Sequence, residues 1–315
     1  MKKDSKIYVS GYTGLAGSAI LRELKRRGFK NIITENSKKL DLRDEPKVSA
    51  FFKRTMPEYV FHAAARVGNM NSNIKYPAEF LYHNLLIQNN VIHNSFLSCV
   101  KRLIFFSSNC AYPKLCPQPM KEEYLFSGLI EPTNEAYGIS KIAGIKMCES
   151  YNQQYGTKFL TVIPASIYGP GDHFDKERAH IIPSLIAKLH SAKLKKNPRI
   201  NIGVNPNKSR EFIFVDDLAD GCIFLMNLKT FPKLPRSAIN MGTGKSINMF
   251  HLGEKLKKAV GYEGDIIWNL KSPQGMPQKI LNVNRINKLG WQNKINLGDG
   301  LSETYKWFLK NHVRN

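Results

Sequence analysis

The sequence predicts an α/β protein built on a parallel β-sheet that helices cover on both faces. Short apolar runs alternate with amphipathic stretches through the first half of the chain. These runs are apolar throughout, as expected for strands that are buried on both faces. With 315 residues, of which 42% are hydrophobic, the chain is long enough for one large domain or two unequal ones.

The spacing of apolar residues places the individual elements of this sheet. In the first predicted helix, Leu15, Ala19, Ile20 and Leu24 recur at helical intervals. The short runs without polar interruption predict strands. In chain order we expect strand 7–9, helix 14–27, strand 31–35, helix 47–54, strand 59–65, helix 77–100, strand 103–107, helix 137–155 and strand 159–164.

The amino-acid composition of the sequence changes after about residue 165. Prolines and glycines become frequent, as in Gly169-Pro170-Gly171, which indicates a smaller region rich in loops. Residues 211–218 return to a strand followed by a helix, and 240–244 resemble a strand end and a turn. We therefore expect residues 1–165 plus about 211–245 to form one domain. About 166–210 plus 246–315 would form a second, discontinuous one.

Charge and cysteine content narrow the classes of protein. The net charge is +22, but lysine is spread along the chain, and its densest cluster, 193–199, accompanies no nucleic-acid-binding motif. We expect no nucleic-acid partner; a positive field instead suits an anionic ligand. The five cysteines have irregular spacing, which predicts reduced thiols in a cytoplasmic protein and no metal site. No apolar run reaches the length of a membrane span, and the amino terminus does not resemble a signal peptide.

A glycine-rich loop directly follows the first predicted strand and opens the first helix. It reads Gly11-Tyr12-Thr13-Gly14-Leu15-Ala16-Gly17. Glycines at this spacing permit a tight turn and let backbone N–H groups approach a pyrophosphate at the helix N-terminus. Together with the alternating elements, the loop predicts a doubly wound Rossmann sheet that binds a dinucleotide, with a smaller discontinuous substrate domain.

Other candidate cofactor contacts lie near the ends of the next predicted elements. Glu35, at the end of the second strand, is placed to accept hydrogen bonds from ribose hydroxyls and to repel a 2′-phosphate. Asp41, followed by Leu42, is placed either to bind an adenine amino group or to cap a helix. Ala64, near the end of the third predicted strand, is a further candidate contact.

A serine, a tyrosine and a lysine form the second strong signal. Tyr137 and Lys141 are four residues apart, so they share one face of a helix. We expect the Lys141 ammonium to lower the pKa of the Tyr137 phenol and make it a usable proton donor near neutral pH. Ser108 follows a predicted strand at the carboxyl edge of the sheet, where its hydroxyl can hydrogen-bond the carbonyl oxygen that Tyr137 protonates.

In the order GxxGxxG, SSxxxY and YxxxK, the chain resembles the extended short-chain dehydrogenase/reductases and, among them, the GDP-L-fucose synthase family. The resemblance covers about residues 6–309, and Glu131-Pro132-Thr133-Asn134-Glu135-Ala136-Tyr137 is among its most specific pieces. It implies NADPH-dependent reduction of the C4 ketone of a GDP-linked 4-keto-6-deoxy sugar, preceded by epimerisation at C3 and C5. It also implies a homodimer, through the helices 77–100 and 137–155.

The resemblance also assigns roles to further residues. Cys110 would be the base and His180 the acid of the epimerisation, because protons next to the C4 ketone are acidic. Asn109 would contact the substrate. The remaining candidates match plausible diphosphate or nucleotide contacts, and they are Lys188, Arg210 and Lys279.

Two departures from the family pattern bear on specificity. The family carries arginines for the NADPH phosphate where this chain has Tyr12-Thr13 and Glu35-Asn36-Ser37, so Glu35 favours NADH, although Lys38 and Lys39 offer compensating charges. Around the expected sugar pocket the chain reads Gly203-Val204-Asn205-Pro206. We expect a changed and bulkier sugar, for example a 6-deoxy-4-keto-heptose.

Several alternatives remain open at this point. A 4,6-dehydratase is disfavoured, because those enzymes place an Asp-Glu pair where this chain has Asn109-Cys110. A UDP-sugar 4-epimerase would leave Cys110 and His180 without a role. The chain could also be a C4 reductase without epimerase activity, or a non-catalytic protein that binds nucleotides or nucleic acid.

Overall fold

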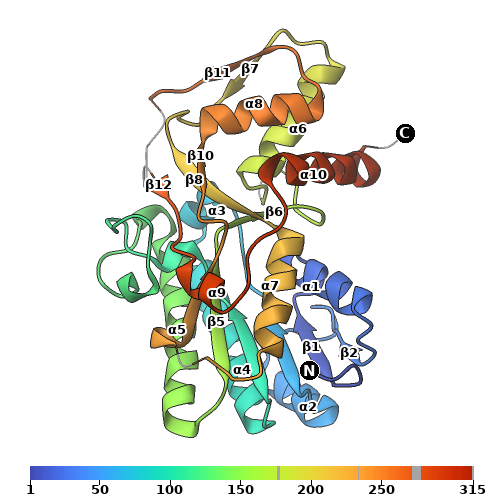
Figure 1. Cartoon of the computed structure of the whole chain (residues 1–315), viewed down its shortest axis with the longest axis vertical. Helices are drawn as coiled ribbons and strands as arrows, with labels where there is room; N and C mark the ends of the chain where they lie inside the picture. The colour runs from blue at the N-terminus through green and yellow to red at the C-terminus, as the bar shows by residue number, and fades with distance from the viewer. Residues whose placement is uncertain (176–177, 233, 272–277, 314–315) are drawn as a thin grey trace.

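The computed structural model of the chain describes residues 1–175, 178–232, 234–271 and 278–313. Its centre is a six-stranded sheet of order β2-β1-β3-β4-β5-β9 in which all neighbouring strands are parallel (Figure 1). The strands of this sheet are β1 (Ile7–Ser10), β2 (Ile32–Ile33), β3 (Tyr59–His62), β4 (Arg102–Phe106), β5 (Phe159–Pro164) and β9 (Ala238–Met241).

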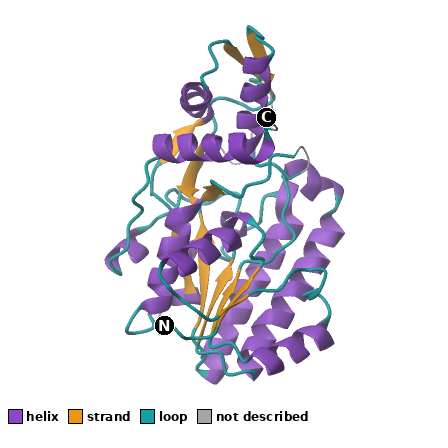
Figure 2. Ribbon diagram, turned by 90° about the vertical axis from the view of Figure 1, so that its right-hand side faces the viewer, coloured by secondary structure: helices purple, strands orange, loops and turns teal. Residues whose placement is uncertain are grey.

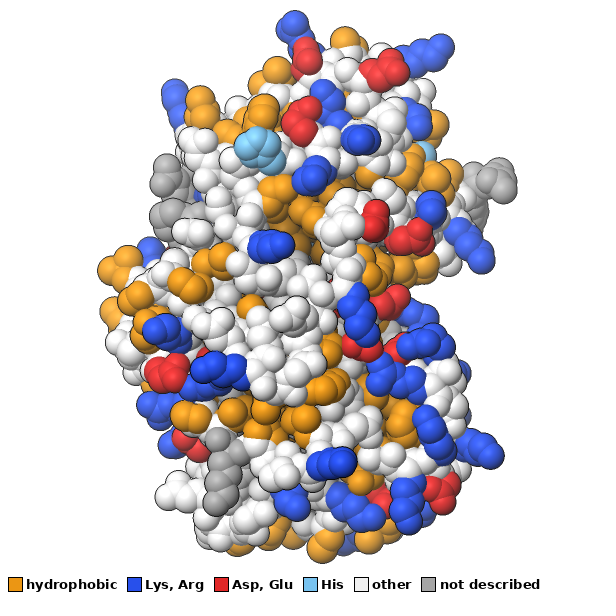
Figure 3. Space-filling view, viewed as in Figure 1, with side chains coloured by type: hydrophobic (Ala, Val, Ile, Leu, Met, Phe, Trp, Pro, Cys, Tyr) orange, Lys and Arg blue, Asp and Glu red, His pale blue; other side chains and the backbone are white. Residues whose placement is uncertain are grey.

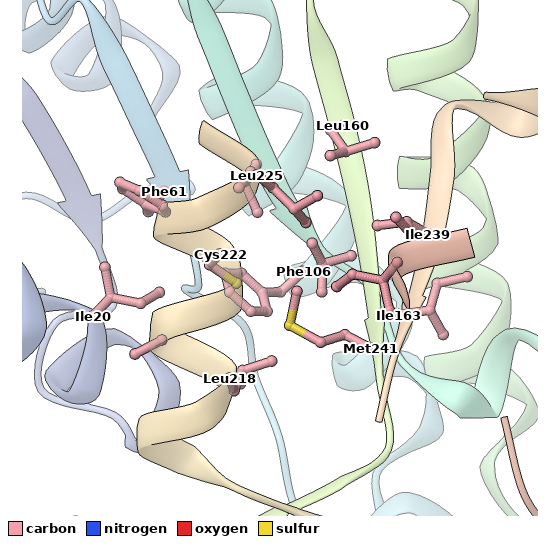
Figure 4. Close-up of a cluster of buried hydrophobic side chains, with 14 of the residues drawn as sticks. Ile20, Phe61, Phe106, Leu160, Ile163, Leu218, Cys222, Leu225, Ile239 and Met241 are labelled. Atoms are coloured by element: carbon pink, nitrogen blue, oxygen red, sulfur yellow. The ribbon is translucent and has the colours of Figure 1, made fainter. Parts of the chain in front are cut away.

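Helices cover both faces of the sheet, which confirms the predicted doubly wound architecture (Figure 2). On one face α1 (Leu15–Arg26) packs against α7 (Val215–Asn227). On the other, α4 (Pro77–Leu97) lies between α5 (Glu135–Tyr155) and α2 (Glu45–Thr55). Buried side chains from both layers fill the space against the strands. Figure 4 shows part of the core under α7, where Leu218, Cys222 and Leu225 face the sheet residues Phe106 and Leu160.

A second, smaller group of elements follows β5. Strand β8 (Ser209–Phe214) lies at its centre and pairs with β6, β10 and β12. A buried core of its own joins three helices to this sheet. The strands are β6 (Ser166–Tyr168), β7 (Arg199–Ile202), β10 (Ser246–Asn248), β11 (Asp265–Trp268) and β12 (Gln278–Lys279), and the helices are α6 (Ile181–Leu194), α8 (Met249–Val260) and α10 (Leu297–His312).

The remaining helices are short and lie in connections. They are α3 (Met70–Lys75), α9 (Asn284–Lys288) and the 3₁₀ helices η1 (Asn109–Ala111), η2 (Glu122–Tyr124), η3 (Pro132–Asn134) and η4 (Pro235–Ser237). Within the described parts of the chain, no helix is long and apolar enough to cross a membrane.

The boundaries differ from those expected in a few places. The second strand is Ile32–Ile33 rather than 31–35, because β2 lies at the sheet edge and pairs with β1 over these two residues alone. The third strand ends at His62, before Ala63-Ala64-Ala65, because the chain turns there beside the glycine loop. The long helix after Pro77 ends at Leu97 rather than 100.

Candidate active site

The glycine loop lies at the point where the strand order reverses, between β1 and β3. Gly11 has a φ of +69°, and a Cβ atom on it would lie 2.7 Å from the Cα atom of Ala64. A Cβ atom on Gly17 would lie 2.1 Å from the carbonyl oxygen of Gly11, so only glycine lets α1 pack this closely. Gly14 is the N-cap of α1, and the first turn of the helix contains no acid. These features fit a pyrophosphate, which needs close backbone approach and a helix N-terminus without negative charge.

The structure places Ala64 beside this loop. Its amide lies 3.4 Å from the hydroxyl of Ser10, which is also 2.7 Å from the Nδ1 atom of His62. His62 is fully buried, and desolvation together with the nearby Lys141 charge lowers its pKa to about 3, so His62 is neutral at physiological pH. Sequence reasoning missed this histidine, because a single histidine at a strand end carries no distinguishing pattern.

The next cofactor candidates lie in the chain segment that follows β2, the strand at the edge of the sheet. Glu35 is half-buried, accepts a hydrogen bond from the amide of Asn36 at 3.1 Å, and lines a hollow of about 340 Å³ with Lys39, Lys47 and Arg54. Asp41 is held by the Arg43 side chain at 2.6 Å, and these hydrogen bonds lower the pKa of Asp41 to about 2. Leu42 is half-buried, and its carbonyl oxygen accepts from the amide of Asn90 at 2.9 Å.

Ser108, Tyr137 and Lys141 come together at the carboxyl end of β4. Ser108 caps η1 and accepts a hydrogen bond from the amide of Cys110 at 3.2 Å, while Tyr137 lies in the first turn of α5 and hydrogen-bonds the Ser108 hydroxyl. Lys141 is 3% exposed; its ammonium donates to the carbonyl oxygen of Phe106 at 3.0 Å and lies 5.7 Å from the centre of the Tyr137 ring.

The electrostatics of this group differ from the sequence expectation. Burial lowers the pKa of Lys141 to about 7, so its positive charge is only partly present at neutral pH. Burial also raises the pKa of Tyr137, as does the nearby Cys110, whereas the hydrogen bond with Ser108 lowers it. The pKa of Tyr137 is therefore raised rather than lowered as expected, because the removal of the phenol from water is the largest influence on it. Tyr137 is held protonated and ready to donate.

Cys110 lies on η1, one turn from Ser108, and is half-buried. The Nδ2 atom of Asn134 donates to its sulfur at 3.1 Å, and the thiol itself lies 3.8 Å from the Oδ1 atom of Asn109. Helix α5 packs closely against this turn, because a Cβ atom on Gly138 would lie 2.8 Å from the carbonyl oxygen of Cys110. Cys110 therefore belongs to the same cluster as Ser108 and Tyr137.

His180 is the N-cap of α6, on the chain segment that follows β6. Its side chain is exposed, yet desolvation by the surrounding groups lowers its pKa, and the nearby His173 lowers it further. The lowered pKa favours the neutral imidazole, whereas the acid role that the resemblance implies for His180 requires the protonated form.

The three candidate substrate cations lie on β8, β12 and α6. Arg210 on β8 and Lys279 on β12 are register partners in adjacent parallel strands, so the structure brings them side by side. Arg210 also faces Cys110: burial lowers the pKa of Arg210, and the cysteine partly offsets this. Lys188 lies apart from this pair, exposed on α6. Other lysines and arginines are scattered over the face seen in Figure 3, as the even spread of lysine in the sequence predicts.

Glu211, next to Arg210, has a structural role that sequence reasoning missed. It is 2% exposed, and its carboxylate accepts from the amides of Thr243 at 2.6 Å, Gly244 at 2.7 Å and Leu281 at 2.6 Å. These contacts fix β8 to the chain after β9 and to the residues beyond β12. Glu211 thereby helps to hold Arg210 and Lys279 in place.

A second hollow, of about 620 Å³, lies away from this chemistry. Tyr168, Phe212 and Phe214 line one side of it, and residues 292–297 line the other. The candidate catalytic residues do not contribute to its lining. Within the described residues, no group of three or more His, Cys, Asp or Glu side chains is arranged to hold a metal ion.

Comparisons with known proteins agree with this geometry. The NAD dependent epimerase/dehydratase family matches residues 7–242. The chain is 41% identical to a GDP-L-fucose synthase of Escherichia coli (strain K12) over 316 residues, covering 98% of both chains. Its fold matches that of a GDP-mannoheptose C4 reductase from Campylobacter jejuni with NADP bound, with 39% identity, a TM-score of 0.90 and coverage of 98% and 99%. A GDP-6-OMe-4-keto-L-xylo-heptose reductase from the same organism matches at 36% identity and a TM-score of 0.92, with 99% of each chain covered.

Proposed function

Because the chain belongs to the NAD dependent epimerase/dehydratase family, and within it to the GDP-L-fucose synthases and their relatives, we propose how its residues reduce a GDP-linked 4-keto sugar. The enzyme is an NAD(P)H-dependent reductase of such sugars, and in the GDP-L-fucose synthases the same activity is joined to epimerisation. The observation that carries the residue assignment is the hydrogen bond between Ser108 and Tyr137, with Lys141 buried beside them.

The chain's own groups supply the proton for the reduction. A nicotinamide cofactor, when bound, would supply the hydride to C4 of the sugar. As negative charge develops on the ketone oxygen, Tyr137 donates its proton to that oxygen, and Ser108 orients the carbonyl by a hydrogen bond. Lys141 then favours the resulting phenolate, because a positive charge near Tyr137 stabilises its anionic form. Gly11, Gly14 and Gly17 would hold the pyrophosphate of the cofactor at the start of α1.

We assign the epimerisation to Cys110 and His180. The Cys110 thiolate removes a proton from C3 or C5, where the carbanion is an enolate of the C4 ketone. A group on the opposite face of the sugar, assigned to His180, returns a proton with inverted configuration. Cys110 is supported in this role by its place beside Ser108 and Tyr137, which would hold the ketone that makes these protons acidic.

Solvent deuterium tests this division of labour. In heavy water, product from the parent enzyme should carry deuterium at C3 or C5, and Cys110→Ser should abolish that label. Product without label at either carbon would leave a C4 reductase without epimerase activity, the second candidate function. Tyr137→Phe should lower kcat by at least about a hundredfold, the usual contribution of a positioned general acid. Unchanged turnover in Tyr137→Phe would remove it as the proton donor.

The preference for NADH over NADPH is proposed from Glu35. A carboxylate just after β2 is expected to accept hydrogen bonds from the ribose hydroxyls of a dinucleotide and to repel a 2′-phosphate. Lys39, Lys47 and Arg54 around the same hollow oppose this effect, although Lys47 is paired with Asp44 at 2.7 Å. We expect kcat/KM to be higher with NADH, and Glu35→Gln to raise kcat/KM for NADPH while lowering that for NADH, because the variant loses the carboxylate that would accept from the ribose hydroxyls. A higher kcat/KM with NADPH in the parent enzyme would refute the proposal.

The sugar is proposed to be a GDP-linked 4-keto-6-deoxy-heptose rather than a hexose. The segment Gly203-Val204-Asn205-Pro206 departs from the GDP-L-fucose synthase pattern, and two of the similar structures act on GDP-linked heptoses. Initial rates on matched hexose and heptose GDP-4-keto sugars test this. A kcat/KM at least as high on the hexose would overturn the heptose assignment.

A further inference from the structure

Asn134 occupies a helix cap without using its side chain as a cap. It is the N-cap of α5, a position where asparagine normally accepts a hydrogen bond from an amide in the first turn of the helix. Within the described residues its side chain makes no such bond, and its Nδ2 atom instead donates to the sulfur of Cys110 at 3.1 Å. The amide is therefore directed away from the helix and toward the candidate base.

The other end of the same amide supports this interpretation. The Oδ1 atom of Asn134 is buried and has no hydrogen-bond partner among the described residues. A buried acceptor without a partner is unfavourable, and the unused cap adds to that cost. Since neither feature stabilises the fold, the orientation of Asn134 is best explained by the bond to Cys110.

We propose that Asn134 is a positioning residue that stabilises the Cys110 thiolate and directs it toward the substrate. A hydrogen bond to a charged acceptor is stronger than one to a neutral acceptor, so an N–H donor favours the thiolate over the thiol. The competing contact, from the thiol to the Oδ1 atom of Asn109, is long at 3.8 Å. This inference rests on the proposed role of Cys110 as the base of the epimerisation.

The charges that face Cys110 fit a thiolate. Arg210 on β8 and Tyr137 on α5 are both close enough to interact with its charge. Arg210 attracts the thiolate. Burial raises the pKa of Tyr137, and the charge on Cys110 raises it further, so ionisation of the base keeps the proton on Tyr137. Cys110 can therefore be ionised while Tyr137 remains protonated in the same enzyme molecule.

The rate of alkylation of Cys110 measures its thiolate fraction without any need for turnover. We would treat the protein with iodoacetamide at pH 7 and follow the tryptic peptide of residues 103–114, which contains Cys110 alone. The neighbouring peptide of residues 115–121 contains Cys116 and serves as an internal reference. Burial raises the pKa of Cys116 to about 11, so its slow alkylation should be the same in every variant.

Asn134→Leu, which keeps the size of the side chain but removes its hydrogen bonds, should slow alkylation of Cys110 by about tenfold or more, given the strength of a bond to a charged group. Asn134→Asp keeps the ability to cap α5, so it should fold, and its negative charge should slow alkylation further. Asn248→Asp, at the N-cap of α8 where the side chain does accept from the amide of His251, should change nothing. A rate in Asn134→Leu that is unchanged or faster overturns the proposal, because a faster rate means that the thiol donates to the amide.

Solvent exchange at C3 and C5 separates this inference from the proposed function. If Cys110→Ser abolishes exchange and Asn134→Leu lowers it about tenfold, both stand. If Cys110→Ser abolishes exchange but Asn134→Leu changes neither exchange nor alkylation, only the role of Asn134 fails. If Cys110→Ser retains exchange, Cys110 is not the base, and the role of Asn134 in the reaction fails with it.

Discussion

At the scale of single residues, two glycines of the first loop differ in the room available to a side chain. A Cβ atom on Gly17 would lie 2.1 Å from the Gly11 carbonyl oxygen, whereas one on Gly14 would lie 3.4 Å from the same atom. We expect Gly17→Ala to lower the free energy of unfolding by about 2 kcal/mol or more, as overpacking does. Gly14→Ala should change it by less than about 1 kcal/mol. Urea unfolding of both variants tests this, and equal losses would contradict the proposed packing.

Lys141 shows how burial sets the protonation state of a candidate catalytic residue. The folded protein lowers its pKa from 10.5 to about 7, so the unfolded chain binds more protons between these values. The contribution of Lys141 to stability therefore increases as pH rises from about 7 to 10.5, and its cost is fully present below pH 7.

Lys141→Met should remove this loss of folding stability while abolishing activity. At pH 6 we expect the variant to be more stable than the parent by on the order of 2 kcal/mol, because a neutral side chain of similar length replaces a buried charge. The difference should shrink at pH 9. Thermal melts at both pH values test the prediction, and a variant that is less stable than the parent at pH 6 would contradict it.

At the scale of elements, Glu211 joins three parts of the chain that are distant in sequence. Its carboxylate binds the amides of Thr243, Gly244 and Leu281, and a Cβ atom on Gly242 would lie 2.1 Å from one of its oxygens. The strand that carries Arg210 thus depends on a buried acceptor that has no room to move.

Glu211→Gln should be strongly destabilising, although it removes a single oxygen. The new amide group would direct N–H donors at backbone N–H donors, so at least one buried group would lose its partner, at a cost of about 2–3 kcal/mol. The control is Asp216→Asn, whose carboxylate pairs with Arg22 at 2.8 Å on the surface and should contribute less than about 1 kcal/mol. Denaturant unfolding of the two variants measures the contrast, which a loss below about 1 kcal/mol in Glu211→Gln would refute.

At the scale of the whole molecule, the outer surface of α4 and α5 is the surface proposed to join two copies of the chain. Large apolar side chains remain exposed there, among them Tyr82 at 63% on α4 and Ile139 at 43% on α5. Exposed apolar patches on adjacent helices are typical of protein interfaces. The homodimer is proposed from the family resemblance together with these side chains.

Ile139→Asp should convert the dimer to a monomer, because the charge would be buried without a partner. Ile267→Asp is the matched control, because Ile267 has a similar exposure of 45%. It lies on β11, which pairs with β7 and does not belong to the six-stranded sheet that α4 and α5 cover. Sedimentation of the parent and both variants checks the expectation. A parent that sediments as a monomer, or an Ile139→Asp variant that remains a dimer, would refute this interface.

The division into two domains also concerns the whole molecule and remains a prediction. Residues 1–165 plus about 211–245 are proposed as the dinucleotide-binding domain. Limited proteolysis that cuts first near residues 165, 210 and 245 would support these boundaries.

Features that depend on local spacing can be predicted from the amino-acid sequence alone. The period of the apolar residues placed the strands and helices of the parallel sheet. The glycine loop predicts a dinucleotide site, and the pair Tyr137 and Lys141 predicts a proton donor. Such patterns are readable because the residues that act together lie within one or two turns of each other.

The desolvation of each group and the contacts between distant residues depend on how the elements pack in three dimensions. The pKa of Tyr137 is raised rather than lowered, because burial depends on the layers that pack over α5 and not on the residue four positions away. Arg210 and Lys279 became neighbours through strand pairing, and Asn134 met Cys110 because α5 packs against η1. These contacts join residues separated by 24 to 69 positions, across which no local periodicity acts.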